Sequence, residues 1–301
     1  MANFKFSSFI GSASISVLTT LSFHPGINAE ESDVDIVCPV NPTQLFESGG
    51  FCTLTPEKYG VRIYEMGLCT SNPISSNQFS RDSCSTTLSN NTPVLTDMAS
   101  GKSFDLKSEN PVEQPKAGKY SHAYIIIDPE FQLQFTYKYN NTTYYSNGKN
   151  SSASSQVKNA TTVPPAKPFI ETLDNFGDDE EGFLATANAP VEGGSITALL
   201  TDSNLIRSTS AAGTQRLVGV FTPSKPIEIM KDSKGLEVQF IVTDTAGGVE
   251  DCSTEEDYDD YFDMIDQDPS QSFERTGNRP DKSDQLCYFG SGPFSAKFRS
   301  F

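Results

Sequence analysis

Tryptophan is absent from the sequence, and histidine occurs only as His24 and His122. Tryptophan supplies the broad apolar face on which sugar rings commonly pack, so its absence weighs against a carbohydrate enzyme without excluding one that uses Asp and Glu. Ser-His-Asp and Cys-His mechanisms need a histidine base. His122 lies within a predicted strand, where we interpret it as a packed or surface residue rather than a base.

Motifs that carry chemistry are also missing. The sequence has no C-x-x-C pair, no G-x-S-x-G and no glycine-rich phosphate loop, and its cysteines lack the spacing of zinc ligands. No long window follows the 3.6-residue period of a helix, apart from the short acidic segment 254–265. The sequence therefore predicts no catalytic residue and favours a protein that is not an enzyme.

The first 29 residues have the layout of a secretory signal peptide. One charge, at Lys5, precedes an apolar run over residues 9–23, a Pro-Gly break and an A-x-A-like site ending at Ala29. The run falls short of the ~20 strongly apolar residues that a membrane-spanning helix needs. We predict cleavage after Ala29 and a mature chain without a membrane span. It would be secreted, extracellular or displayed on the cell surface, with the periplasm as the alternative compartment.

Cysteine occurs six times, always after the predicted signal peptide. An even number in an exported chain predicts disulfides rather than reactive thiols. We predict nearest-neighbour pairs because closing short loops needs no special topology, although the sequence leaves other pairings open. The predicted pairs are Cys38 with Cys52, Cys69 with Cys84, and Cys252 with Cys287.

Acidic residues outnumber basic ones, 39 to 22, which gives a formal net charge of −17. Removal of residues 1–29, with one lysine and no acidic residue, would change it to −18. Nucleic acids and anionic lipids bind basic patches. Neither nucleic acid nor anionic lipid is therefore a predicted partner. We interpret the acidity mainly as a property that keeps the protein soluble.

The clearest β pattern lies in residues 119–146. Aromatic residues and a leucine at positions 131, 133, 135, 137 and 139 alternate with polar residues, as in a strand with one buried face. Residues 120–127 and 142–145 also have strand composition, and Asn140 and Asn141 tolerate the positive φ of a tight turn. We predict an antiparallel meander of three adjacent strands.

Further strands are predicted elsewhere, while residues 69–91 are predicted as a loop and residues 226–243 as a hairpin. These strands are residues 59–68, 93–96, 102–106, 195–201, 216–222, 226–230, 235–243 and two within 286–301. Many short strands, Gly/Pro-rich turns and little helix predict a mainly β protein with antiparallel β-sandwich architecture, stapled by disulfides. The last strand, 294–301, either completes its own sheet or adds to another copy.

Residues 147–167 are almost wholly small, polar or proline, a composition that predicts a linker or long loop. We divide the chain into a signal peptide (1–29), an N-terminal β-domain (30–146), this linker (147–167) and a C-terminal β-domain (168–301). One large sandwich with a long loop is the alternative. N-glycosylation sequons occur at Asn141, Asn150 and Asn159.

Two acidic clusters offer the hard oxygen ligands that Ca²⁺ prefers. One is residues 174–181, and the other includes Asp257, Asp259, Asp260 and Asp263. Neither fits the EF-hand pattern, and the competing interpretation is a solvated, self-repelling loop. Ca²⁺ is thus the one cofactor that the sequence suggests, and we expect weak binding at most.

Four segments resemble a group of uncharacterised exported proteins from marine planktonic bacteria. They are YEMGLCTSNP (64–73), HAYIII (122–127), TTYYS (142–146) and GSGPF (290–294). The resemblance implies export and a β-rich fold. It implies no activity and no functional residue.

Together these features predict a secreted or cell-surface structural protein, an adhesion, coat or filament component that self-associates through strand edges. The alternative is an exported glycoside hydrolase or carbohydrate-binding protein that recognises surface glycans through carboxylates. A deep cleft with two carboxylates roughly 5 to 9.5 Å apart would favour that alternative. A shallow surface with an open strand edge would favour assembly.

Overall fold

The computed structural model describes residues 3–6, 37–42, 51–75, 78–102, 104–177, 182–251 and 286–301. This part of the chain is mainly β, with two short 3-10 helices, η1 (Met98–Ser100) and η2 (Ala211–Gly213). It contains no helix long and apolar enough to cross a membrane. The predicted mainly β, disulfide-stapled fold is confirmed.

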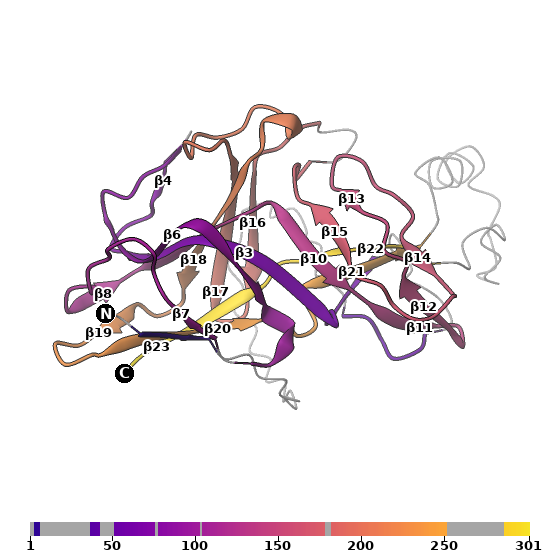
Figure 1. Cartoon of the computed structure of the whole chain (residues 1–301), viewed down its shortest axis with the longest axis horizontal. Coiled ribbons are helices and arrows are strands. Elements are labelled where there is room, and N and C mark those ends of the chain that lie inside the picture. The colour runs from indigo at the N-terminus through magenta and orange to yellow at the C-terminus, as the bar shows by residue number, and fades with distance from the viewer. Residues whose placement is uncertain are drawn as a thin grey trace, which may run out of the picture.

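One nine-stranded sheet runs through the middle of the molecule (Figure 1). Its strands are β13 (Ser151–Ser152), β15 (Phe169–Thr172), β10 (Glu130–Gln134), β3 (Lys58–Cys69), β6 (Cys84–Asp97), β9 (His122–Ile127), β18 (Arg216–Pro223), β17 (Gly194–Thr201) and β16 (Thr186–Val191). Every pair is antiparallel except β13 with β15.

β3 is the central strand, and a bulge changes which of its side chains face the core. Tyr59, Val61 and Ile63 are fully buried, as period 2 requires. The register shifts between Ile63 and Glu65, so an extra residue enters the strand. Met66 therefore joins the same core cluster, whereas sequence alternation placed it on the opposite face with Arg62 and Tyr64.

The predicted three-strand meander is only partly correct. β9 and β10 do not pair with each other. Both run antiparallel to β3, β10 opposite residues 58–60 and β9 opposite residues 63–69, while β6 pairs with the other edge of β3. β9 and β10 therefore follow one another along the same edge of β3, which is long enough to pair with both. The second pair is confirmed: β11 (Thr136–Tyr139) and β12 (Thr142–Ser146) form a hairpin, with φ of 46° at Asn140 and 61° at Asn141.

A second layer packs on this sheet and makes the architecture a sandwich. Its strands are β23 (Ser295–Ser300), β20 (Gly235–Ile241), β1 (Asn3–Phe6) and β7 (Phe104–Leu106). Leu236, Val238 and Phe240 alternate inward from β20. The ring of Phe294 joins the layers, 5.5 Å from the Phe240 ring and 5.8 Å from that of Phe221.

Smaller sheets complete the two ends of the molecule (Figure 1). At one end lie β2 (Phe51–Leu54), β21 (Gly247–Asp251) and β22 (Leu286–Ser291), with β11, β12 and β14 (Ala160–Thr161). The Phe135 ring stacks there on Phe289 at 5.1 Å. At the other end β19 (Ile227–Ile229) pairs with β8 (Gly118–Tyr120). The predicted 226–243 hairpin is therefore wrong, since β19 and β20 belong to different sheets.

The predicted boundary at residues 147–167 does not separate two sheets. β18 pairs with β9, and β15 pairs with β10, so strands from both predicted domains share one sheet and one core cluster. This arrangement favours the alternative of one large sandwich. Residues 147–167 are not a free linker, since they contain β13 and β14. Asn159 is buried and exchanges two hydrogen bonds with the backbone of Phe289, so this sequon is closed to glycosylation in the folded protein.

Three other expectations concern strands. The predicted loop 69–91 is corrected, because β6 begins at Cys84 and a two-strand hairpin, β4 (Ile74–Ser75) with β5 (Gln78–Phe79), precedes it. The C-terminal strand β23 completes its own sheet by pairing with β20. Of the predicted signal peptide only residues 3–6 are described, as β1 between β20 and β7, and its cleavage stays a prediction.

Candidate functional site

His122 begins β9, so its predicted place in a strand is confirmed. Its Nδ1 lies 2.8 Å from Ser121 Oγ, and the Ser121 hydroxyl donates to the Thr70 carbonyl oxygen at 2.9 Å. Burial lowers the pKa of His122. Among the described residues no carboxylate contacts the imidazole, so the pair lacks the orienting acid of a Ser-His-Asp triad.

Two of the predicted disulfides are confirmed. Cys38 bonds to Cys52, and Cys69 bonds to Cys84. Cys287 is also disulfide-bonded, while its predicted partner Cys252 lies outside the described residues. Disulfides persist in oxidising compartments, and they are therefore compatible with an extracellular or periplasmic protein.

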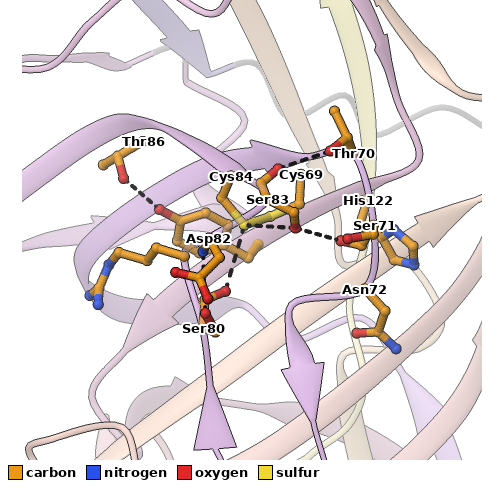
Figure 2. Close-up of a disulfide and its surroundings, with 12 residues drawn as sticks. Cys69, Thr70, Ser71, Asn72, Ser80, Asp82, Ser83, Cys84, Thr86 and His122 are labelled. Atoms are coloured by element: carbon orange, nitrogen blue, oxygen red, sulfur yellow. Dashed lines mark hydrogen bonds between the residues drawn. A yellow bond between two sulfur atoms is a disulfide. The ribbon is translucent and has the colours of Figure 1, made fainter.

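The Cys69–Cys84 disulfide closes a loop that folds over the outer face of the large sheet (Figure 2). The two cysteines stand directly opposite in the β3–β6 register. Phe79, in the loop, packs on the Tyr124 ring at 4.8 Å, and its N–H donates to the Leu205 carbonyl oxygen at 3.1 Å. A second apolar cluster thus lies between the sheet and this loop.

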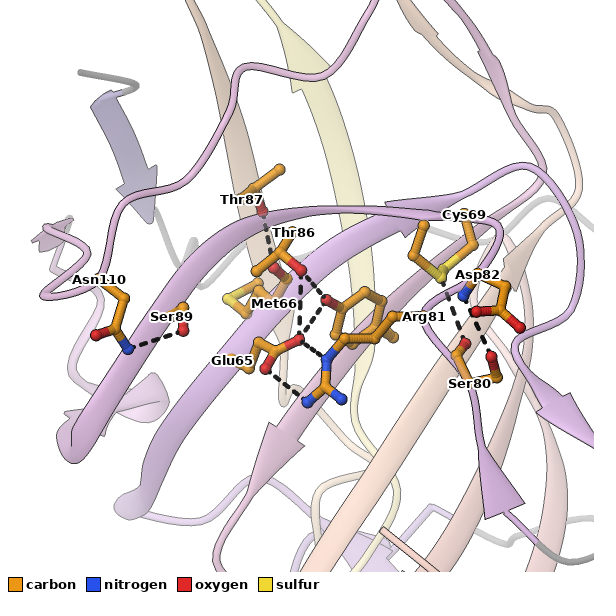
Figure 3. A network of polar contacts seen from close by, with 12 residues as sticks. Glu65, Met66, Cys69, Ser80, Arg81, Asp82, Thr86, Thr87, Ser89 and Asn110 are labelled. Carbon is orange, nitrogen blue, oxygen red and sulfur yellow. Dashed lines mark hydrogen bonds and ion pairs between the residues drawn. A yellow bond between two sulfur atoms is a disulfide. The ribbon is translucent and has the colours of Figure 1, made fainter. Parts of the chain in front are cut away.

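A polar network holds the same loop (Figure 3). Arg81 donates from Nε to Glu65 Oε1 at 2.7 Å and from Nη2 to Oε2 at 2.8 Å. The Tyr124 hydroxyl also donates to Glu65 Oε1, at 2.6 Å, and lies 2.9 Å from Thr86 Oγ1. Burial and the neighbouring Glu65 carboxylate raise the pKa of Tyr124 far above its usual value, so the phenol stays a hydrogen-bond donor. The Glu65 carboxylate is fully engaged, which suits a clamp better than an acid or base.

A second polar cluster lies where β3, β18 and the segment between β9 and β10 meet. The Tyr64 hydroxyl donates to Asp128 Oδ1 at 2.8 Å, and the Arg216 guanidinium lies 4.0 Å from the centre of the Tyr64 ring. Nearby, Arg62 and Glu130 form an ion pair of 3.1 Å. Because a cation already covers one face of the Tyr64 ring, that face is not available to a sugar.

Glu171, on β15, has a perturbed carboxyl group. Ser291 donates its N–H to Glu171 Oε2 at 2.6 Å, which ties β15 to β22. Burial raises the pKa of Glu171, and the Asp174 carboxylate adds to the shift. Asp174 itself accepts from the N–H and the hydroxyl of Ser154, at 2.9 and 2.7 Å. The pair is therefore engaged in internal contacts, although a raised carboxyl pKa is also a feature of general acids.

The acidic clusters are only partly described. Asn175 hydrogen-bonds within its own loop, to Gly177 and Leu184, while residues 178–181 lie outside the described residues. Asp257, Asp259, Asp260 and Asp263 also lie outside them. In the described ranges no group of three or more His, Cys, Asp or Glu side chains is placed to hold a metal. Calcium binding by these clusters stays a prediction.

A cavity of about 10 Å³ lies between the two layers of the sandwich. It is lined by apolar and small residues, among them Met66, Ile125 and Phe240, and by no carboxylate. A void of this size holds at most one water molecule. It belongs to the core and is not a ligand site.

Comparison of the chain with models of protein families, with curated proteins and with solved structures finds no match.

Proposed function

We propose that this chain is an exported structural protein that works through its surface by associating with further copies, as an adhesion, coat or filament component. The observation that supports this most is an open strand at the border of the nine-stranded sheet. β16 pairs only with β17 in the described part of the chain. Strands in such positions present backbone N–H and C=O groups that another chain can pair with.

The polar side chains described above support the same proposal, because they connect parts of this chain to one another. The polar groups around Glu65 and around Tyr64 hold the neighbouring loops and strands through bonds of 2.6–3.1 Å. Export, predicted from residues 1–29, and the two disulfides suit a protein that lasts outside the cytoplasm. The resemblance to exported proteins of marine planktonic bacteria points the same way.

Sedimentation velocity over a wide concentration range tests the proposal, with the protein produced in an oxidising compartment so that its disulfides form. We expect assemblies whose fraction grows with concentration, and electron microscopy of the same samples should show particles of regular shape. A chain that remains monomeric at every concentration contradicts the proposal.

A glycoside hydrolase is the second candidate because burial raises the pKa of Glu171. An inverting or retaining enzyme needs a second carboxylate at the right distance and room for a sugar. Release of reducing sugar from a panel of polysaccharides, lost in Glu171→Gln, would support this candidate. Equal release by both forms, or none, would remove it.

A further inference from the structure

The outer edge of β16 is the least protected strand edge that the structure describes. β16 pairs with β17 through six register positions, from Thr186 opposite Leu199 to Val191 opposite Gly194. The described residues include no other backbone partner for Thr186–Val191, and Asn188 and Pro190 are exposed. With respect to the described residues, the edge is therefore open along the strand.

Two other long edges are better protected. Residues 108–110 cover the middle of the β6 edge by bonding to Ser89, Asn90, Asn91 and Thr92. The edge strand β23 carries Lys297 and Arg299, and charged residues discourage strand addition. β16 has the sequence TANAPV, which contains no charge. Its one protective residue is Pro190.

The proline shows which backbone groups point outward. In an antiparallel pair, alternate residues bond across to the partner and the others point away. Pro190 has no N–H to give to β17, so it occupies an outward position. Asn188 and Thr186, two and four residues earlier, share that orientation. The free edge therefore presents two N–H groups, of Thr186 and Asn188, and three carbonyl groups, of Thr186, Asn188 and Pro190.

The strand itself carries no charge and the carboxylate that follows it is neutralised, although the chain carries a net charge of −17 and four acidic residues, 178–181, precede the strand in the sequence. The nearest carboxylate after the strand, on Glu192, forms an ion pair of 2.7 Å with Lys297. Two acidic molecules can therefore meet through two uncharged strands, and the carboxylate that follows each strand adds no unpaired charge. A second copy of this chain fits that condition.

We propose that β16 pairs antiparallel with β16 of a second copy around a two-fold axis at Asn188, which joins two nine-stranded sheets into one. This rests on the self-association proposed above and names its surface. Asn188 would stand opposite Asn188 of the second copy and exchange two hydrogen bonds with it. The Thr186 N–H of each copy would donate to the Pro190 carbonyl oxygen of the other copy. The two prolines, which lack an N–H, would then lie at the two ends of the paired segment. On the inner face Ala187 and Ala189, partly buried here, would extend the apolar layer.

Substitutions that place a charge at the two-fold axis test whether Asn188 stands opposite Asn188 of the second copy. In the full chain, Asn188→Lys and Asn188→Asp each place like charges directly opposite one another, which disfavours cross-strand pairs. Each variant alone should raise the dimer dissociation constant by about two- to fivefold, and an equal mixture of the two should restore the dimer. Asn204→Lys is the matched control, because Asn204 is exposed in the turn that follows β17, outside the residues that would pair, and should leave association unchanged.

A cross-link supplies a second readout. Residues in a hydrogen-bonded antiparallel pair have Cα atoms about 5.5 Å apart, within the range of a disulfide. Asn188→Cys should therefore form a covalent dimer on air oxidation, while Asn204→Cys should not. Association that is unchanged in both charge variants, with no cross-link at position 188, overturns this interface and leaves the proposed function standing. A wild-type chain that never associates overturns both.

Discussion

Removing the Cys69–Cys84 disulfide by substituting alanine at both positions should lower the free energy of unfolding by about 3 kcal/mol. The cross-link spans a sequence separation of 15, and a closed loop of about that length removes about 10 cal/mol/K of entropy from the unfolded chain, or about 3 kcal/mol at room temperature. The folded state should keep its shape, because the β3–β6 ladder and the Glu65–Arg81 ion pair still hold the loop.

The Cys38–Cys52 disulfide is a matched control. Its sequence separation is 14, so the same loop entropy applies to within about 0.1 kcal/mol. The local environments also match, since Cys69 and Cys52 are fully buried and their partners are partly buried. If the constraint on the unfolded chain is what stabilises the protein, the two double-alanine variants should lose equal stability.

Equilibrium unfolding in urea, followed by far-ultraviolet circular dichroism, measures both losses. A loss of about 3 kcal/mol corresponds to a melting temperature about 5 °C lower in a chain of this size. The entropic argument fails if the Cys69–Cys84 variant loses less than about 1 kcal/mol, or if the two variants differ by more than about 1.5 kcal/mol. Either result would mean that native contacts near one bridge dominate its effect.

Three further substitutions test the packing and electrostatics. In Gly67→Ala the new Cβ would lie 2.4 Å from Tyr124 Cε1, so urea unfolding should show a loss of about 1 to 3 kcal/mol, and an unchanged midpoint would refute the close approach. Arg81→Ala should cost only about 1 kcal/mol, because the Arg81 side chain is 47% exposed, and the loss should shrink in high salt. Glu171→Gln should stabilise the protein increasingly as the pH rises above about 4.5 and have no effect well below it. The folded state holds a proton that the unfolded state loses in that range, so a gain that does not depend on pH would contradict the raised pKa.

Local patterns in the sequence were sufficient to predict several strands and the two observed disulfides. The alternation of Leu236, Val238 and Phe240 is a property of adjacent residues, and β20 buries those three side chains. The paired asparagines at 140 and 141 specify the turn between β11 and β12 through their positive φ. Cysteines that close loops of 14 and 15 residues likewise need no knowledge of the rest of the fold.

Strand partners could not be predicted in the same way, because they depend on segments far apart in the chain. The Pro129 turn looks like the reversal of a hairpin, yet β9 and β10 continue along one edge of β3. No residue near Pro129 indicates how long β3 is, so the local sequence cannot show that β9 and β10 share it. The bulge beside Tyr64 is equally invisible in the sequence, and it moves Met66 onto the core face.

The polar site was missed for a related reason. Glu65, Arg81, Thr86 and Tyr124 come from β3, the cross-linked loop, β6 and β9, and no motif links them. The composition of residues 84–92 also reads as loop, because Ser, Thr and Asn dominate it. β6 forms since the second edge of the buried β3 needs hydrogen-bond partners, and Leu88 enters the core from it. The signal for this site lies in the predicted Cys69–Cys84 pair, because a strand that leaves Cys84 beside β3 brings Thr86 near Glu65.

β16 was not predicted as a strand, and the reason bears on its proposed role. Alanine, asparagine and proline have low β-propensity, so TANAPV carries no strand signal. It is extended because β17 pairs with it and Gly193, at φ +84°, permits the two-residue turn between them. A strand that depends on its neighbour in this way adds little attraction of its own to a new partner. Pairing between copies would then depend on the match around Asn188, which is why one charge at that position should weaken it measurably.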